Sequence, residues 1–197
     1  MKDTTDITII LDRSGSMQAI RTDTIGGFNS FLEEQKKLPD KASLSLIQFD
    51  HEYEPVYRGI DIQDAAKLTL ETFVPRGNTA LYDAVGRTIV KTGERLAKLP
   101  EAERPKRVLF LIITDGAENA SREYSAAMLH SMITEQREKY AWEFVFLGAN
   151  QDSFLNAQQI GVALAANFVA DAQGTHSLYS NVSGGTSDFR SGKGYTI

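Results

Sequence analysis

The chain has 197 residues, 42% of them hydrophobic, and a formal net charge of −5, a composition typical of one globular domain with its own core. It contains no cysteine, which excludes disulfide scaffolds, zinc ribbons, thiol nucleophiles and iron–sulfur centres. Its 26 acidic residues outnumber its 21 basic residues, which argues against a nucleic-acid or anionic-membrane partner because both need a basic face.

No targeting or membrane segment is recognisable in the sequence. Residues 1–6 are acidic where a signal peptide has a basic region, and no segment reaches the roughly 18 apolar residues of a membrane helix. We therefore expect a soluble, cytoplasmic protein.

Short apolar runs alternate with amphipathic segments along the chain. β-Branched apolar runs predict buried strands, and apolar residues at helical spacing predict helices. The expected strands are 6–11, 42–49, an edge strand over 52–57 and 59–62, a central strand at 108–113, 142–147 and 167–170. The expected helices are 22–37, 79–99, 123–140 and 153–160. This alternation predicts an α/β fold with a mainly parallel sheet and helices on both of its faces.

The C-terminal segment is open to two interpretations. Its glycines and serines fit a loose terminus, whereas Leu178, Val182 and Phe189 have the spacing of a helical stripe. We favour a docked helix that ends near Arg190 and is followed by a loose end. The predicted organisation is thus one domain over residues 1–170 and a C-terminal extension over residues 171–197.

Polar residues follow the first and central strands and open the long helix between them. In open α/β sheets, ligands bind at the carboxyl ends of the strands. The oxygen donors gathered by these three pieces are Asp12, Ser14, Ser16, Thr79 and Asp115. Hard oxygen ligands without nitrogen or sulfur select Mg²⁺, with Mn²⁺ or Ca²⁺ as alternatives, over zinc or copper.

The three pieces together resemble the metal-ion-dependent adhesion site of von Willebrand factor A domains. The matching motifs are Asp12-x-Ser14-x-Ser16, Thr79 and Thr114-Asp115-Gly116, with 67 and 36 residues between the three pieces. The resemblance covers roughly residues 4–170. It implies a Rossmann-like, doubly wound sheet of about six strands with one antiparallel edge strand, as in the stand-alone bacterial or bacteriophage members of the family.

The resemblance also implies how the site works. Ser14, Ser16 and Thr79 would supply hydroxyl ligands, Asp12 and Asp115 would act largely through bound water, and an acidic side chain of a partner protein would fill the last position. The expected function is a divalent-metal-dependent protein-interaction module without enzymatic activity, because no titratable group free of the metal lies near it.

The alternative from another class is a Mg²⁺-dependent phosphoryl-transfer enzyme of the haloacid dehalogenase type. Such an enzyme also has an aspartate directly after its first strand. It needs a second aspartate two residues later as general acid, and Ser14 stands at that position.

Charged residues beside these motifs have expected roles of their own. Asp83 is expected to act on the helix dipole or to support the ligands, and Arg13 to point to solvent or the partner. Glu118 and Asn119 either cap the next helix or select the partner. His51 is either an ordinary turn residue or part of the rim of the site.

Overall fold

The computed structural model describes residues 1–149 and 151–196, and its centre is a six-stranded sheet in the order β3-β2-β1-β4-β5-β6. The strands are β1 (Lys2–Asp12), β2 (Ala42–Phe49), β3 (Tyr53–Asp61), β4 (Pro105–Thr114), β5 (Glu143–Gly148) and β6 (Leu164–Asn167). β3 pairs antiparallel with β2, and every other neighbouring pair is parallel. This arrangement confirms the predicted fold class, including the antiparallel edge strand.

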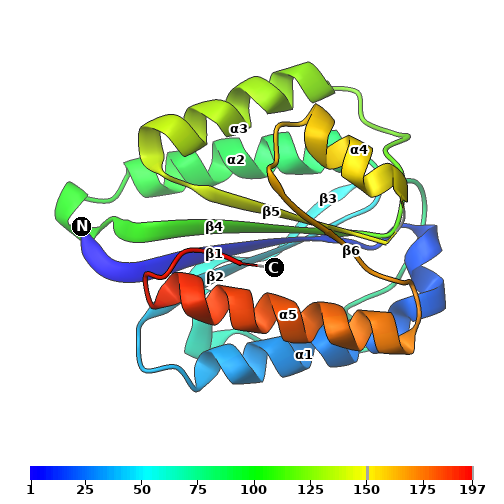
Figure 1. Ribbon diagram of the computed structural model, residues 1–197, viewed down its shortest axis with the longest axis horizontal. Helices are drawn as coiled ribbons and strands as arrows, with labels where there is room; N and C mark the ends of the chain where they lie inside the picture. The colour runs from blue at the N-terminus through cyan, green and yellow to red at the C-terminus, as the bar shows by residue number, and fades with distance from the viewer. Residues whose placement is uncertain (150, 197) are drawn as a thin grey trace.

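Helices cover both faces of the sheet (Figure 1). One face carries α2 (Leu81–Ala97), α3 (Ala126–Tyr140) and α4 (Gln151–Gln159), and the other carries α1 (Arg21–Lys36) and α5 (Ala172–Arg190). Short 3₁₀ helices span Gly15–Ile20, Ile62–Asp64 and Glu101–Glu103. Within the described part of the chain, no helix combines the length and the apolar character needed to cross a membrane.

The two faces of the sheet hold separate apolar cores because side chains alternate along each strand. Ile7, Ile9 and Leu11 of β1 point into the core shared with α1 and α5, whereas Ile10 belongs to the core under α2 and α3. The predicted stripe of α2 is buried in this second core, as Leu81, Val85, Ile89 and Leu96.

The centre and the edge of the sheet lie where the sequence places them. β1 and β4 form the central pair, and β4 is buried without interruption from Val108 to Thr114. Pro55, which cannot donate a hydrogen bond to a neighbouring strand, lies opposite Ile47 in the edge strand β3.

Several element boundaries differ from the predicted ones, and tertiary contacts explain two of the differences. The last strand was expected at 167–170 but is 164–167, because Asn167 already lies opposite Gly148, where β5 ends. The helix expected from Glu123 begins at Ala126, because the carboxylate of Asp83 holds the backbone N–H groups of residues 122–124 before the helix starts.

The C-terminal helix α5 lies alongside α1 (Figure 1). Asp171 caps its first turn by accepting a hydrogen bond from the Gly174 N–H at 2.7 Å. Its last residue, Arg190, is fully buried and donates to the Asp40 carboxylate at 2.8 Å. Beyond the helix, Tyr195 is buried against Gly185.

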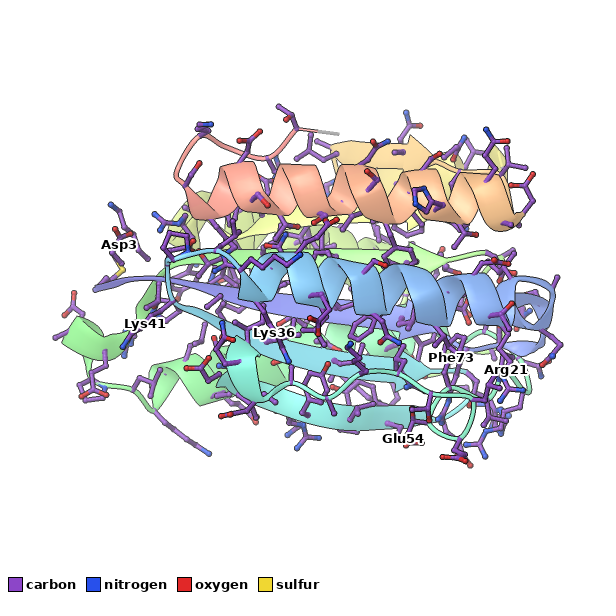
Figure 2. The ribbon with its side chains drawn as sticks, turned by 90° about the horizontal axis from the view of Figure 1, so that it is seen from below. Asp3, Arg21, Lys36, Lys41, Glu54 and Phe73 are labelled. Carbon is purple, nitrogen blue, oxygen red and sulfur yellow. The ribbon has the colours of Figure 1, made fainter. Side chains whose placement is uncertain are left out.

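The connection between β3 and α2 runs beside α1, on the face of the sheet seen in Figure 2. Lys36 donates to the Ala65 carbonyl at 2.9 Å, Asn29 exchanges two hydrogen bonds with the Leu68 backbone, and Arg21 donates to the Phe73 carbonyl at 2.9 Å. These contacts fix the path of the chain that brings residues 77–79 to the carboxyl end of the sheet.

Candidate metal centre

The candidate site lies at the carboxyl ends of β1 and β4, at the right-hand end of the sheet in Figure 1. The two strands run parallel, with Leu11 opposite Ile113, so the residues that follow leave the sheet at the same edge. Thr114 marks this junction, because its hydroxyl donates a hydrogen bond of 2.5 Å to Oδ2 of Asp12. The first and third motifs are therefore in direct contact.

The loop after β1 turns back onto its own aspartate. The Ser14 N–H donates to Oδ1 of Asp12 at 2.6 Å, and the hydroxyls of Ser14 and Ser16 are 3.1 Å apart. Ser16 in turn donates to Oδ1 of Asp115 at 2.6 Å. Four of the five predicted ligands are thus linked by a continuous set of short polar contacts.

Thr79 joins this cluster from the loop before α2. A Cβ atom placed on Gly116 would lie 2.9 Å from Oγ1 of Thr79, 3.4 Å from Oγ of Ser16 and 3.6 Å from Oδ2 of Asp12. Oxygens from the end of β1 and the loop after it, and from the loop before α2, therefore surround one point beside the bare Cα of Gly116, which lies in the loop after β4. The structure brings all five candidate ligands together.

A set of backbone contacts holds Thr79 in place. Its N–H donates to Oδ1 of Asn119 at 2.9 Å, and its carbonyl accepts from the Asn119 N–H at 3.0 Å. Glu118 accepts from the Tyr82 N–H at 2.9 Å. Asn119 and Glu118 therefore brace the start of α2, which corrects the expectation that they cap the helix following them.

Asp83 lies in the first turn of α2, where an acidic side chain was expected to act on the helix dipole, and its carboxylate also holds a neighbouring loop. Its two carboxylate oxygens accept the backbone N–H groups of Arg122, Glu123 and Tyr124, each at 2.9 Å. Burial alone would raise the pKa of Asp83, but these three N–H groups and the nearby Arg87 lower it below its usual value. Asp83 thus stabilises a loop, and its oxygens are occupied without any ion.

Arg13 was expected at the surface but is buried. Its Nε donates to Oδ2 of Asp50 at 3.0 Å, and its Nη1 lies 2.7 Å from the carboxylate of Glu54. Arg76 donates to the same Asp50 oxygen at 2.9 Å, so one carboxylate ties the first motif loop to the loop before α2. No local pattern in the sequence indicates this pairing, because Asp50 lies 37 residues from Arg13 and 26 residues from Arg76.

His51 is half exposed in the turn between β2 and β3. Its ring lies against Gly77, where an added Cβ would meet Nδ1 of His51 at 2.2 Å, and the Gly77 carbonyl accepts from the Gly15 N–H at 3.1 Å. His51 therefore borders the loops of the site.

The two carboxylates of the cluster have unfavourable surroundings for a negative charge. Burial raises the pKa of Asp12 to about 6, and the adjacent Asp115 adds to the rise, while hydrogen bonds from Thr114 and Ser14 oppose it. Burial also raises the pKa of Asp115, against the hydrogen bond from Ser16. Because no arginine or lysine side chain among the described residues contacts Asp12, a divalent cation would supply the missing positive charge.

The donor set suits a hard divalent cation. The described residues contain no cluster of three or more histidine, cysteine, aspartate or glutamate side chains able to hold a metal. The candidate centre agrees with this finding, because it combines two carboxylates with three hydroxyls, and such oxygen ligands match Mg²⁺ and Mn²⁺. The ring of oxygens around Gly116 leaves space that a single methyl group would fill.

Two residues that shape the centre were not assigned a role from sequence. Thr114 orients Asp12, and Gly116 leaves open the point on which the oxygens converge. Both residues lie beside Asp115 in the third motif. The expected parallel pairing of the first and central strands is a signal that could have placed Thr114 next to Asp12.

Solved structures share this architecture. The manganese-loaded TRAP protein of Plasmodium vivax has a TM-score of 0.60 at 18% identity, over 89% of this chain and 72% of that protein. A von Willebrand factor type A protein from Catenulispora acidiphila has a TM-score of 0.60 at 15% identity, over 93% of this chain. The chain has the von Willebrand factor A fold.

The name of a third neighbour with this fold records a bound metal. Proximal thread matrix protein 1 from the mussel byssus, with a zinc-occupied MIDAS motif, has a TM-score of 0.54 at 16% identity over 91% of this chain. The match with this chain covers 46% of the mussel protein and 42% of the Catenulispora protein, so the chain spans less than half the length of either. No protein-family model and no curated protein matches the sequence.

Proposed function

We propose that this chain is a divalent-metal-dependent protein-interaction module in which Asp12, Ser14, Ser16, Thr79 and Asp115 hold the cation. The observation that carries the proposal is the convergence of oxygens from the end of β1, the loop after it and the loop before α2 beside Gly116, with Asp115 of the loop after β4 joined to them through Ser16. Structural neighbours whose names record manganese or a zinc-occupied MIDAS motif support a divalent cation. We name Mg²⁺ as the physiological ion because all five donors are hard oxygens.

The exposure of the cluster supports binding of an outside ligand. Asp12, Ser14 and Thr79 are buried, whereas Ser16 is exposed, so the cluster opens to solvent on the side of Ser16. A divalent cation held there would supply a Lewis-acidic position that accepts one more oxygen ligand. The ligand we propose is an aspartate or glutamate of a protein partner, because two carboxylates and neutral hydroxyls leave no excess negative charge to repel it.

The contacts of Asp12 favour binding over phosphoryl transfer. Ser14 stands where the haloacid dehalogenase reaction needs a general acid, and its hydroxyl is far less acidic than the carboxylic acid that the reaction requires. No lysine among the described residues contacts Asp12, so a side chain that would steady a phosphoryl group is missing there. The module that we propose is therefore not an enzyme. It acts in the cytoplasm, as a domain of the stand-alone type that binds to other proteins within a larger complex.

Calorimetric titration with Mg²⁺ and Mn²⁺ tests the metal site directly. We expect one ion per chain, at least a hundredfold weaker binding for Asp12→Asn, and weaker binding for Ser16→Ala. Asp64→Asn is the matched control, because Asp64 is exposed and makes no side-chain contact with described residues. Equal metal affinity in Asp12→Asn and in the wild type would disprove the ligand set.

Selection of binding peptides from a random library tests the partner chemistry. Peptides captured in Mg²⁺ and released by EDTA should carry an aspartate or glutamate whose change to the amide abolishes binding. Thr79→Ala should weaken the selected peptide more than it weakens the metal, as the resemblance implies for this threonine. Peptides that bind equally in EDTA would show that the interaction uses another surface.

A further inference from the structure

A groove separates α2 from the edge of the sheet, away from the candidate metal centre. α2 packs over Ile10 and Phe49 of β1 and β2, and its outer side borders a cavity of about 520 Å³ above β2 and β3. Ile47 and Tyr53 form the apolar part of its lining, and the hydroxyls of Ser45 and Thr88 also face it. A cavity of this size falls in the range that holds small molecules.

The lining of this groove is strongly cationic in a chain whose net charge is −5. Arg58, Lys91, Arg95 and Lys98 line it, against the single carboxylate of Glu94. Arg58 and Lys98 are exposed and form no hydrogen bond or ion pair with any described residue. Lys91 contacts Glu94 at 3.1 Å, but both side chains are exposed, so water screens this pair.

Arg95 is held in place at the floor of the groove. Its Nη1 and Nη2 donate to the two oxygens of Asp6 at 2.9 and 2.8 Å, and Asp6 is buried. Gly59 has a φ of +58°, and a Cβ there would lie 2.6 Å from Nη1 of Arg95, so the edge strand leaves room for the guanidinium. Asp6 takes two of the five N–H groups, and no other acceptor for Arg95 exists among the described residues.

We propose that this groove binds a phosphorylated small molecule with at least two negative charges, of the nucleoside diphosphate class. A pre-oriented guanidinium matches phosphate oxygens in pairs, and the flexible lysines add point charges around them. Arg58 and Lys98 have no ion-pair partner among the described residues, and a diphosphate carries enough negative charge to engage both of them together with the N–H groups of Arg95 that Asp6 leaves free. Ile47 and Tyr53 offer an apolar surface to the organic part of the ligand.

Calorimetric titration with ADP and with inorganic pyrophosphate, in EDTA at low salt, tests the proposal. EDTA removes divalent metal, so a phosphate cannot bind through the metal centre, and the outcome is independent of the proposed interaction function. We expect one ADP per chain and weaker binding of pyrophosphate, which lacks the organic part. Asp12→Asn should bind ADP as the wild type does.

Two double variants of equal charge distinguish the groove from general electrostatic attraction. Arg58→Gln with Lys98→Gln should weaken ADP binding at least tenfold without unfolding, since both side chains are exposed and neither forms a hydrogen bond or ion pair with another described residue. Lys41→Gln with Lys106→Gln removes the same charge from exposed positions outside the groove and should change affinity less than twofold. Absence of ADP binding in the wild type, or equal losses in both double variants, would overturn the proposal.

Discussion

Two pairs of aspartates lie near the carboxyl edge of this sheet, and their surroundings differ in a way that separates function from architecture. Asp12 and Asp115 face hydroxyl groups and each other, and burial raises the pKa of both. Asp50 and Asp83 are also poorly solvated, which alone would raise the pKa of each. The guanidinium of Arg76, the backbone N–H of Glu52 and the charge of Arg13 lower the pKa of Asp50. Three backbone N–H groups lower that of Asp83.

This difference in surroundings indicates which carboxylates have their negative charge balanced by protein groups in the absence of a metal ion. Asp50 and Asp83 already have positively polarised partners, so they stabilise the loops that carry the site. Asp12 accepts only neutral donors, and its negative charge is uncompensated until a cation binds. The four aspartates at this edge therefore divide into a bracing pair, Asp50 and Asp83, and the pair proposed as metal ligands, Asp12 and Asp115, which we call the ligand pair. Mutations should separate the two pairs.

The largest effect is expected when a bracing carboxylate is removed. Asp83→Ala leaves three backbone N–H groups without an acceptor, which should lower the free energy of unfolding by roughly 2–4 kcal/mol. Urea unfolding measures this loss, with Asp64→Ala as the control that removes an exposed carboxylate. Metal affinity of the folded protein should change less than about threefold, and a loss as large as that of Asp12→Asn would place Asp83 in the metal centre.

Filling the space beside Gly116 should affect the ligand pair instead. Gly116→Ala puts a methyl group 2.9 Å from Oγ1 of Thr79, which must move, so metal affinity should fall about tenfold. Gly116 is not in the left-handed region, so alanine fits its backbone. Gly93→Ala, whose methyl would meet open space in α2, is the control and should leave metal affinity unchanged.

A smaller effect is expected when the ligand pair loses a charge in the absence of metal. In EDTA, Asp12→Asn should unfold at the wild-type temperature or about 2–4 °C above it, which corresponds to about 1 kcal/mol. The amide can accept from the Ser14 N–H and donate to Thr114, whose hydroxyl can then donate to the Gly116 carbonyl at 3.2 Å. Clear destabilisation in EDTA would mean that the Asp12 carboxylate braces the fold, as Asp83 does.

The proximity of Asp12 and Asp115 could be predicted from sequence, and the contacts of the bracing pair could not, for a physical reason. Apolar periodicity predicts parallel strands, and parallel neighbours end at one edge, so Asp12 and Asp115 must emerge close together. The partners of Asp83 are backbone groups 39 to 41 residues away, and backbone N–H groups leave no mark in the residue types. Sequence periodicity therefore indicates which face of an element is buried but not which polar groups meet.

The same limit explains the other errors in the predicted fold. Arg13 was expected to point to solvent or to the partner because it alternates with the ligand residues, yet Asp50 and Glu54 pair with it in the folded chain. The apolar residues Phe168 and Val169 favoured a strand beyond Asn167, but β5 has already ended there and offers no further ladder. Element types followed from local pattern, whereas these boundaries depended on neighbours distant in sequence.

The smallest effect that we expect is a change with pH in the stability that the bracing carboxylate Asp83 contributes. The pKa of Asp83 is lower in the folded chain than its usual value of 3.8, so the unfolded state binds the proton more readily. The stabilisation from Asp83 is therefore complete above about pH 5 and is lost as pH falls below about 4 through the folded pKa.

The difference in melting temperature between the wild type and Asp83→Asn should be constant near neutral pH and should shrink in acid. Asp50 titrates in both proteins, so its contribution cancels in this difference. A difference that stays constant down to the acid transition would show that the three N–H contacts do not depend on the charge of Asp83.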